Sequence, residues 1–127
     1  MPSKTTQRDV ILGVVADADG PLSPLEILNA AAPRLPRLGL ATVYRTMKLG
    51  VETGALRAVE LSTGPTRYEP TGRGHHHHFA CRSCHHVYDV EGCPGRFDRL
   101  VPEGFTLESH DLVLYGICES CSETAAA

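Results

Sequence analysis

The sequence has no tryptophan, and aromatic residues make up only 6% of the chain. It also lacks an apolar run long enough to span a membrane, so no membrane partner is expected. The first residues, Met1 to Thr5, lack the apolar core of a secretory signal, and we therefore expect a cytoplasmic protein. In that compartment, paired cysteines more often hold a metal than form disulfides.

A strong excess of charge of one sign is missing too, because the formal net charge is −3. Taken alone, this value argues against binding to nucleic acid. The charges are nevertheless unevenly distributed. Residues 1–74 carry nine Lys/Arg and seven Asp/Glu, whereas residues 75–127 carry three and eight. A mildly basic first part and an acidic second part indicate two small domains with different roles.

Histidine and cysteine are concentrated in residues 75–93, which contain six of the seven histidines and three of the five cysteines. Four cysteines form two Cys-x-x-Cys pairs, Cys81/Cys84 and Cys118/Cys121. A tight turn between two thiolates directs both sulfurs toward one point, and two such turns make the tetrahedral cage of a structural zinc site. Two disulfides or unrelated core thiols are the alternatives.

The first 70 residues read as three helices followed by a hairpin. Apolar periodicity predicts a helix over residues 6–18 with a threonine as its cap, and the capping box Ser23-Pro24-Leu25-Glu26 begins a second helix. In a third helix, from residue 40, Leu40, Val43 and Met47 are expected to face inward. Residues 56–61 and 66–69 alternate as two strands. This pattern predicts a winged helix-turn-helix, with residues 71–74 as a hinge.

Residues 75–127 predict a small α/β unit. Residues 87–90 read as a short strand, residues 94–100 as a helix, and residues 105–115 as a longer alternating strand that leads to the second cysteine pair. The tail from Ser122 is expected to be frayed.

Four segments, in order, resemble the ferric uptake regulator family of metal-dependent bacterial repressors. They are Thr6-Gln7-Arg8, residues 41–45 (Ala-Thr-Val-Tyr-Arg), residues 75–84, and the stretch from His110 to Cys118. The resemblance implies an α+β fold with a winged-helix DNA-binding domain (1–70), a hinge (71–74) and a metal-binding α/β dimerisation domain (75–127). It also implies that the four paired cysteines hold structural zinc.

The function implied by this resemblance is repression of genes for iron, manganese or zinc homeostasis. The expected partners are a second copy of the chain, in a homodimer, and double-stranded DNA carrying a palindromic operator. A second divalent metal, Fe(II), Mn(II) or Zn(II), is expected as the effector. Neither enzymatic activity nor a small-molecule substrate is expected.

A regulatory metal site is implied by a residue-for-residue match at Glu69, His76, His78 and Asp89. On a strand, His76 and His78 point to one face. Their nitrogens, combined with carboxylate oxygens, suit Fe(II) or Mn(II) and also accept Zn(II). Many family members add a histidine just before the second helix, where this chain has Pro21. The alternative is a solvated histidine edge with ordinary surface acids.

A possible third site lies on the opposite face of the same strand, at His75 and His77. The corresponding family site adds a carboxylate from the following helix and the histidine equivalent to His110. Counting back from His110 places Cys93 at the carboxylate position, whereas counting forward from Asp89 places Arg96 there. A site of His75, His77, Cys93 and His110 would prefer zinc. The alternative is a buried Cys93 thiol without metal.

The family's DNA-reading helix matches Thr42, Tyr44, Arg45 and Lys48. Thr42, Arg45 and Lys48 are suited to phosphate contacts, and Tyr44 either touches a thymine methyl group or borders the core. Arg57 and Arg67, on the predicted hairpin, are expected to reach the flanking DNA.

Three other functions compete with a metal-responsive repressor. Peroxide sensing is one, because Asp89 stands where iron-sensing members tend to have glutamate. Zinc storage or transport is another, although a carrier has no need of the residue 42–48 face. A metalloenzyme is the third, but no His-Glu-x-x-His motif supports it.

Overall fold

We describe a computed structural model that covers residues 3–126. Met1, Pro2 and Ala127, which fall within the domains expected from the sequence, lie outside the described residues. The chain divides into two compact units, Met1–Arg73 and Gly74–Ala127. Among the described residues, no helix combines the length and the apolar character needed to cross a bilayer.

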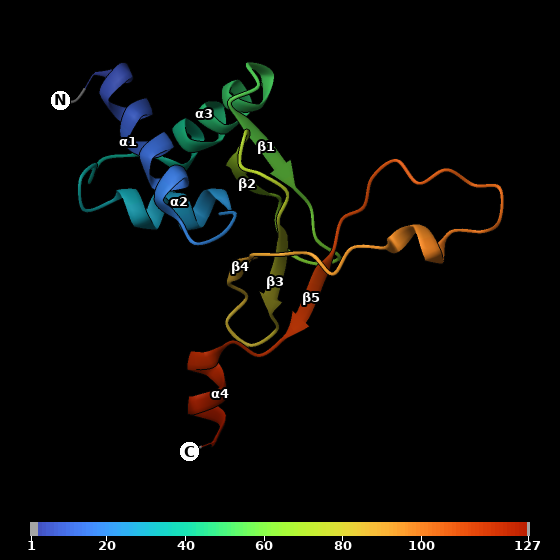
Figure 1. Cartoon of the computed structure of the whole chain (residues 1–127). Helices are drawn as coiled ribbons and strands as arrows, with labels where there is room; N and C mark the ends of the chain where they lie inside the picture. The colour runs from blue at the N-terminus through green and yellow to red at the C-terminus, as the bar shows by residue number, and fades with distance from the viewer. Residues whose placement is uncertain (1–2, 127) are drawn as a thin grey trace. The chain divides into compact units, whose positions relative to one another are not determined.

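The first unit consists of three helices and a two-stranded hairpin (Figure 1). They are α1 (Lys4–Asp17), α2 (Pro24–Ala31), α3 (Leu40–Glu52), β1 (Leu56–Val59) and β2 (Arg67–Pro70). The two strands pair antiparallel, with Arg57 opposite Glu69. Leu22 adds a bridge to Tyr68 through two backbone hydrogen bonds of 3.0 and 2.9 Å. The predicted winged helix-turn-helix is confirmed.

Side-chain caps explain where the first two helices begin. Ser23 Oγ accepts from the Glu26 N–H and Glu26 Oε1 accepts from the Ser23 N–H, at 3.3 and 2.9 Å, so the predicted capping box is present. The predicted threonine cap of α1 is wrong. Ser3 Oγ accepts from the Thr6 N–H at 3.1 Å, and the helix therefore begins before residue 6.

The core of the first unit is an aliphatic cluster contributed by α1, α2, α3 and the hairpin. Its buried members are Ile11, Val15, Leu22, Ile27, Val43, Met47 and Leu56. The expected inward stripe of α3 holds for Val43 and Met47, which are fully buried, but not for Leu40, which is 37% exposed. Leu40 is the first residue of its helix, where neighbouring turns cover less of a side chain.

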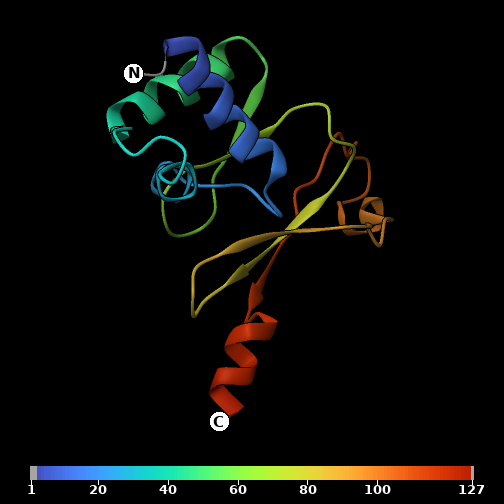
Figure 2. The same ribbon diagram turned by 90° about the vertical axis from the view of Figure 1, so that its left-hand side faces the viewer.

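The second unit contains a three-stranded sheet of order β4-β3-β5. Its strands are β3 (His77–Cys81), β4 (Val87–Val90) and β5 (Val113–Gly116). Strand β3 pairs antiparallel with β4 and parallel with β5, so that His78 lies opposite Asp89. Both views show the segment between β4 and β5 running out to one side of this sheet (Figures 1 and 2).

Three expectations for the second unit are corrected. The helix over residues 94–100 is only a single 3₁₀ turn, η1 (Phe97–Leu100). The strand over residues 105–115 is reduced to β5: residues 105–112 belong to no strand, although the Leu112 carbonyl accepts from the His78 N–H of β3 at 3.2 Å. The tail is not frayed from Ser122, since residues Glu119–Ala126 form helix α4, which continues from the end of β5 (Figure 2).

Few large apolar side chains are buried in the second unit. Among its described residues, the buried ones are Ala80, Val87, Cys81 and Cys118, together with His77 and His78. A unit with so little apolar burial needs another source of stability, such as bound metal.

Candidate metal centres and nucleic-acid interface

The two Cys-x-x-Cys pairs meet at the end of the three-stranded sheet. Cys81 ends β3, and Cys118 follows β5, its parallel neighbour. The Sγ atoms of Cys81, Cys84, Cys118 and Cys121 lie within 4.8 Å of one another, and all five cysteines of the chain are free of disulfides. Four sulfurs bound to a tetrahedral zinc at ~2.3 Å stand about 3.8 Å apart. The Cys84 and Cys118 Sγ atoms are 3.8 Å apart, so this cluster fits zinc.

Backbone hydrogen bonds prepare the sulfur of Cys81 as a thiolate. The N–H groups of Cys84 and Cys118 donate to Cys81 Sγ at 3.5 and 3.4 Å, and they lower the pKa of this thiol to about 5. The backbone N–H of Cys121 lowers the pKa of Cys118. In contrast, Cys121 donates its own proton to Cys118, which raises the Cys121 pKa to about 12. A divalent cation that binds all four sulfurs therefore has to displace the proton held on Cys121.

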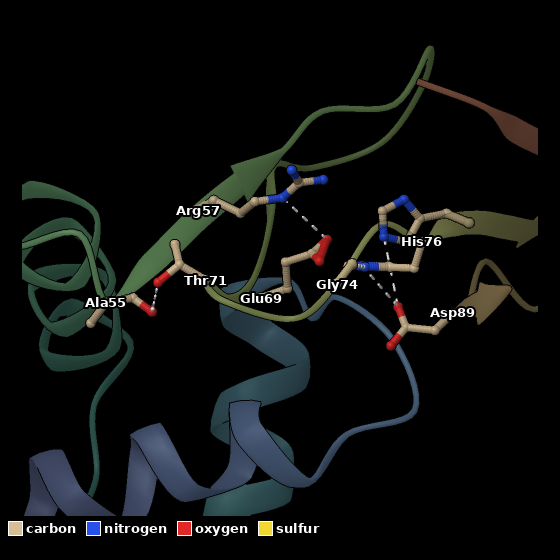
Figure 3. A network of polar contacts seen from close by, with 8 residues as sticks. Ala55, Arg57, Glu69, Thr71, Gly74, His76 and Asp89 are labelled. Atoms are coloured by element: carbon tan, nitrogen blue, oxygen red, sulfur yellow. Dashed lines mark hydrogen bonds and ion pairs between the residues drawn. The ribbon is translucent and has the colours of Figure 1, made fainter. Parts of the chain in front are cut away.

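A second cluster lies on one face of β3 and β4. The ligand atoms of His76, His78 and Asp89 lie within 4.8 Å of one another. Both histidine Nε2 atoms are 3.7 Å from Asp89 Oδ1, and Figure 3 shows the approach of His76 to Asp89. His76 Nδ1 donates to the Gly74 carbonyl at 2.9 Å, which leaves the lone pair of Nε2 directed at the cluster. This arrangement provides two nitrogens and one carboxylate for a divalent metal.

Glu69, the fourth residue of the implied regulatory site, belongs to the first unit. Its side chain is fully buried on β2, and Arg57 Nε lies 3.7 Å from Glu69 Oε1 (Figure 3). The two residues face each other across the hairpin. Arg57, whose side chain is 49% exposed, thus balances the Glu69 charge within the first unit.

A third cluster lies on the opposite face of β3. It consists of His75, His77, Cys93 and His110, whose ligand atoms also lie within 4.8 Å of one another. Arg96, the alternative to Cys93, does not join them: its side chain is 65% exposed and pairs with Asp98 at 3.4 Å. Burial lowers the pKa of His77, and the nearby His75 and His110 lower it further, so the neutral imidazole is favoured.

On α3, the residues matched to DNA reading lie largely at the surface. Tyr44 is 52% exposed, which places it outside the core rather than within it. Arg45 and Lys48 are exposed, and Arg45 Nη2 donates to Thr42 Oγ1 at 3.0 Å. A hollow of about 500 Å³ is lined by residues of α1 and α3, including Arg8 and Arg45. Arg8 was not among the expected DNA-binding residues, although it belongs to Thr6-Gln7-Arg8, one of the four segments that resemble the family.

The expected role of Arg67 is corrected. Its side chain is buried, pairs with Glu26 of α2 and donates to the Pro21 carbonyl at 3.4 Å. Arg67 therefore fastens the hairpin to the start of α2 and is not exposed on the surface of the hairpin.

Residues 3–115 match the model of the ferric uptake regulator family. The ferric uptake regulation protein of Campylobacter jejuni is 30% identical over 128 residues, which cover 96% of this chain and 81% of that protein. A structure of the Helicobacter pylori ferric uptake regulator, described as having three functional metal binding sites, is 25% identical with a TM-score of 0.74, covering 96% and 82% of the two chains. A structure of a zinc-bound manganese uptake regulator is 28% identical with a TM-score of 0.77, covering 88% and 87%.

Proposed function

Because this chain belongs to the ferric uptake regulator family of metal-responsive transcriptional regulators, we propose that it is a repressor that binds palindromic operator DNA as a metal-loaded homodimer. The first unit is the DNA-binding domain, the segment around residues 71–74 is the hinge, and the second unit is the metal-binding dimerisation domain. The observation that carries the proposal is the cluster of His76, His78 and Asp89, which begins three residues after the first unit ends.

The effector metal is held by His76, His78 and Asp89 together with Glu69 of the first unit. Two imidazole nitrogens and two carboxylates form a donor set suited to Fe(II) or Mn(II), which also accepts Zn(II). Since the ligands come from both units, the metal favours one relative orientation of the DNA-binding domain. A metal that binds this orientation more tightly than others shifts the population toward it.

Within the first unit, Arg57 opposes this use of Glu69. To bind Glu69, the metal has to replace the Arg57 guanidinium as the partner of the Glu69 carboxylate. The same step releases Arg57, on the outer part of the hairpin, to reach the flanking phosphate backbone. This competition gives Arg57 a role in both the metal-free and the DNA-bound protein.

Homodimer formation is supported by the exposed edge of the second unit's sheet. Strand β5 pairs only with β3 among the described strands, and its Leu114 and Tyr115 are 44% and 53% exposed. Proteins rarely leave an apolar edge strand uncovered. A second copy of the chain, related by two-fold symmetry, would cover this edge and pair two DNA-binding domains with a palindromic site.

Operator binding under each candidate metal tests the function directly. We expect tight binding of the purified protein to its operator fragment with at least one of Fe(II), Mn(II) or Zn(II), and loss of binding on addition of a chelator. A storage or carrier protein would bind the metals without acquiring affinity for DNA. Failure to bind promoter DNA with any divalent metal would contradict the repressor assignment.

Substitution of basic residues on α3 tests the proposed DNA surface. Arg45→Ala and Lys48→Ala should each weaken operator binding and reduce the slope of log K against log salt by about 0.9, the value for one lost phosphate contact on duplex DNA. Fluorescence anisotropy over a series of salt concentrations provides the measurement. Arg99→Ala, which removes an exposed arginine of η1, is the control and should leave the slope unchanged. If the slopes of Arg45→Ala and Lys48→Ala equal those of the control and the unaltered protein, this face of α3 does not contact the DNA phosphate backbone.

A further inference from the structure

The cluster of His75, His77, Cys93 and His110 lies at the neck of a long loop. Residues 91–112 connect β4 to β5, and the only helix or strand that they contain is the short 3₁₀ helix η1. Cys93 stands near the start of this loop and His110 near its end. His77 is the first residue of β3, the central strand of the sheet, and His75 lies two residues before it. The cluster therefore joins both ends of the loop to the sheet.

The potential donor atoms already converge on a common point. His75 Nε2 and His110 Nε2 are 3.1 Å apart, and Cys93 Sγ is 3.3 Å from His110 Nε2. Nitrogen and sulfur donors of a tetrahedral zinc stand about 3.3–3.6 Å apart, given bond lengths of ~2.0–2.3 Å. The rings of His75 and His77 pack edge to face with centroids 4.4 Å apart, which fixes their orientation.

His77 gives an independent indication that this cluster binds a ligand. The residue is 2% exposed, and its Nε2 atom is buried without a hydrogen-bond partner in the structure. A buried polar nitrogen left unpaired is unfavourable unless another group satisfies it. A metal ion bound by the neighbouring Nε2 and Sγ atoms would satisfy this nitrogen.

Two glycines with positive φ flank the Cys93-Pro94 segment, whose Cys93 sulfur lies near the three histidines. Gly92 and Gly95, on either side of Cys93-Pro94, have φ values of +86° and +70°, which glycine adopts without strain. With this backbone, the Cys93 sulfur and not the Arg96 side chain lies with the histidines. The fourth donor is thus a thiolate, where the family resemblance implies a carboxylate.

We propose that Cys93 makes this cluster a zinc-selective site that clips the neck of the 91–112 loop to β3. Three imidazoles and one thiolate form a closed, comparatively soft tetrahedral set, which favours Zn(II) over Fe(II) and Mn(II). His76, His78 and Asp89 on the other face of the strand offer nitrogen and oxygen only. The two faces of β3 therefore select different metals, and the zinc clip does not depend on the proposed regulatory site.

The accessibility of Cys93 to alkylation tests the proposal on the unaltered protein. Cys93 is exposed, and it is the one cysteine of the chain outside the four-sulfur cluster, so its iodoacetamide adduct is identified by peptide mass spectrometry. Zinc supplied to protein treated with a weak chelator, which leaves the cage zinc in place, should slow this alkylation by about tenfold or more, because a metal-bound thiolate is a poor nucleophile. Mn(II) should have little effect. An alkylation rate that zinc does not change would overturn the proposal.

Metal analysis of two variants identifies the donor. His76→Ala serves as the background, because it removes zinc binding at the other face of β3. In this background, elemental mass spectrometry should show that Cys93→Ser has lost one equivalent of zinc. If some zinc still binds, its affinity should be at least about 10–100-fold lower. Cys93→Asp, the conservative variant, should retain a second metal and gain affinity for Mn(II), measured by electron paramagnetic resonance. Full zinc retention by folded Cys93→Ser, or an unchanged preference in Cys93→Asp, would contradict a thiolate-determined site.

Discussion

Replacement of His76 by alanine is expected to abolish metal-dependent operator binding. His76 Nε2 and His78 Nε2 both lie 3.7 Å from Asp89 Oδ1, so loss of one imidazole removes one of three donors that the second unit contributes. Without effective metal binding, the relative orientation of the two units is no longer biased. The operator affinity in the presence of metal should therefore fall to the metal-free value, a change of about 5- to 150-fold for typical coupling between two sites.

The dimer and the cysteine cage should survive this substitution, because their residues lie elsewhere in the second unit. Sedimentation should give the same mass for His76→Ala and the unaltered protein, and the zinc of the cysteine cage should remain bound in the presence of a weak chelator. His85→Ala is a matched control, since His85 is an exposed histidine outside all three metal-ligand clusters. Retention of metal-dependent binding by His76→Ala would remove this face of β3 from the sensing mechanism.

Local sequence signals determined the parts of the fold that depend on near neighbours. The capping box at Ser23 and Glu26 needs only residues three positions apart, and Val43 and Met47 share a helix face by periodicity alone. The cysteine cluster was predictable from the paired spacing, because each Cys-x-x-Cys turn brings two sulfurs together locally. The association of the two turns then required only that β3 and β5 be neighbours.

Features that depend on distant partners could not be predicted in the same way. Arg67 read as a surface residue of the hairpin, yet its partner Glu26 lies 41 positions earlier and the Arg67 side chain is buried. Residues 105–112 alternate like a strand, but alternation alone does not supply a neighbouring strand, and in the structure they are not part of a strand. The choice between Cys93 and Arg96 likewise depended on the loop backbone, where Gly92 and Gly95 have positive φ values that loop length does not specify.

Removal of a sulfur from the cage is expected to unfold the second unit. This unit buries few apolar side chains, so the zinc that joins Cys81 at the end of β3 to Cys118 after β5 should provide much of its stability. Cys81→Ser and Cys118→Ser should each lose the tightly held zinc. They should also lose the cooperative thermal unfolding of residues 74–127, followed by circular dichroism and hydrogen exchange, while the aliphatic core of the first unit remains protected.

The four positions should not be equivalent. Cys81 is buried and receives two backbone N–H groups, which favour its thiolate, whereas Cys121 is half-buried and holds its proton, with its pKa raised to about 12. Cys81→Ser should therefore destabilise the second unit more than Cys121→Ser, and only the latter should recover partial zinc binding at high zinc concentration. Ser122→Ala, which alters an exposed residue beside the cage, is the control and should keep its zinc. Full zinc stoichiometry in both Cys81→Ser and Cys118→Ser would show that these sulfurs do not hold the metal, and the stability of the second unit would then require a different explanation.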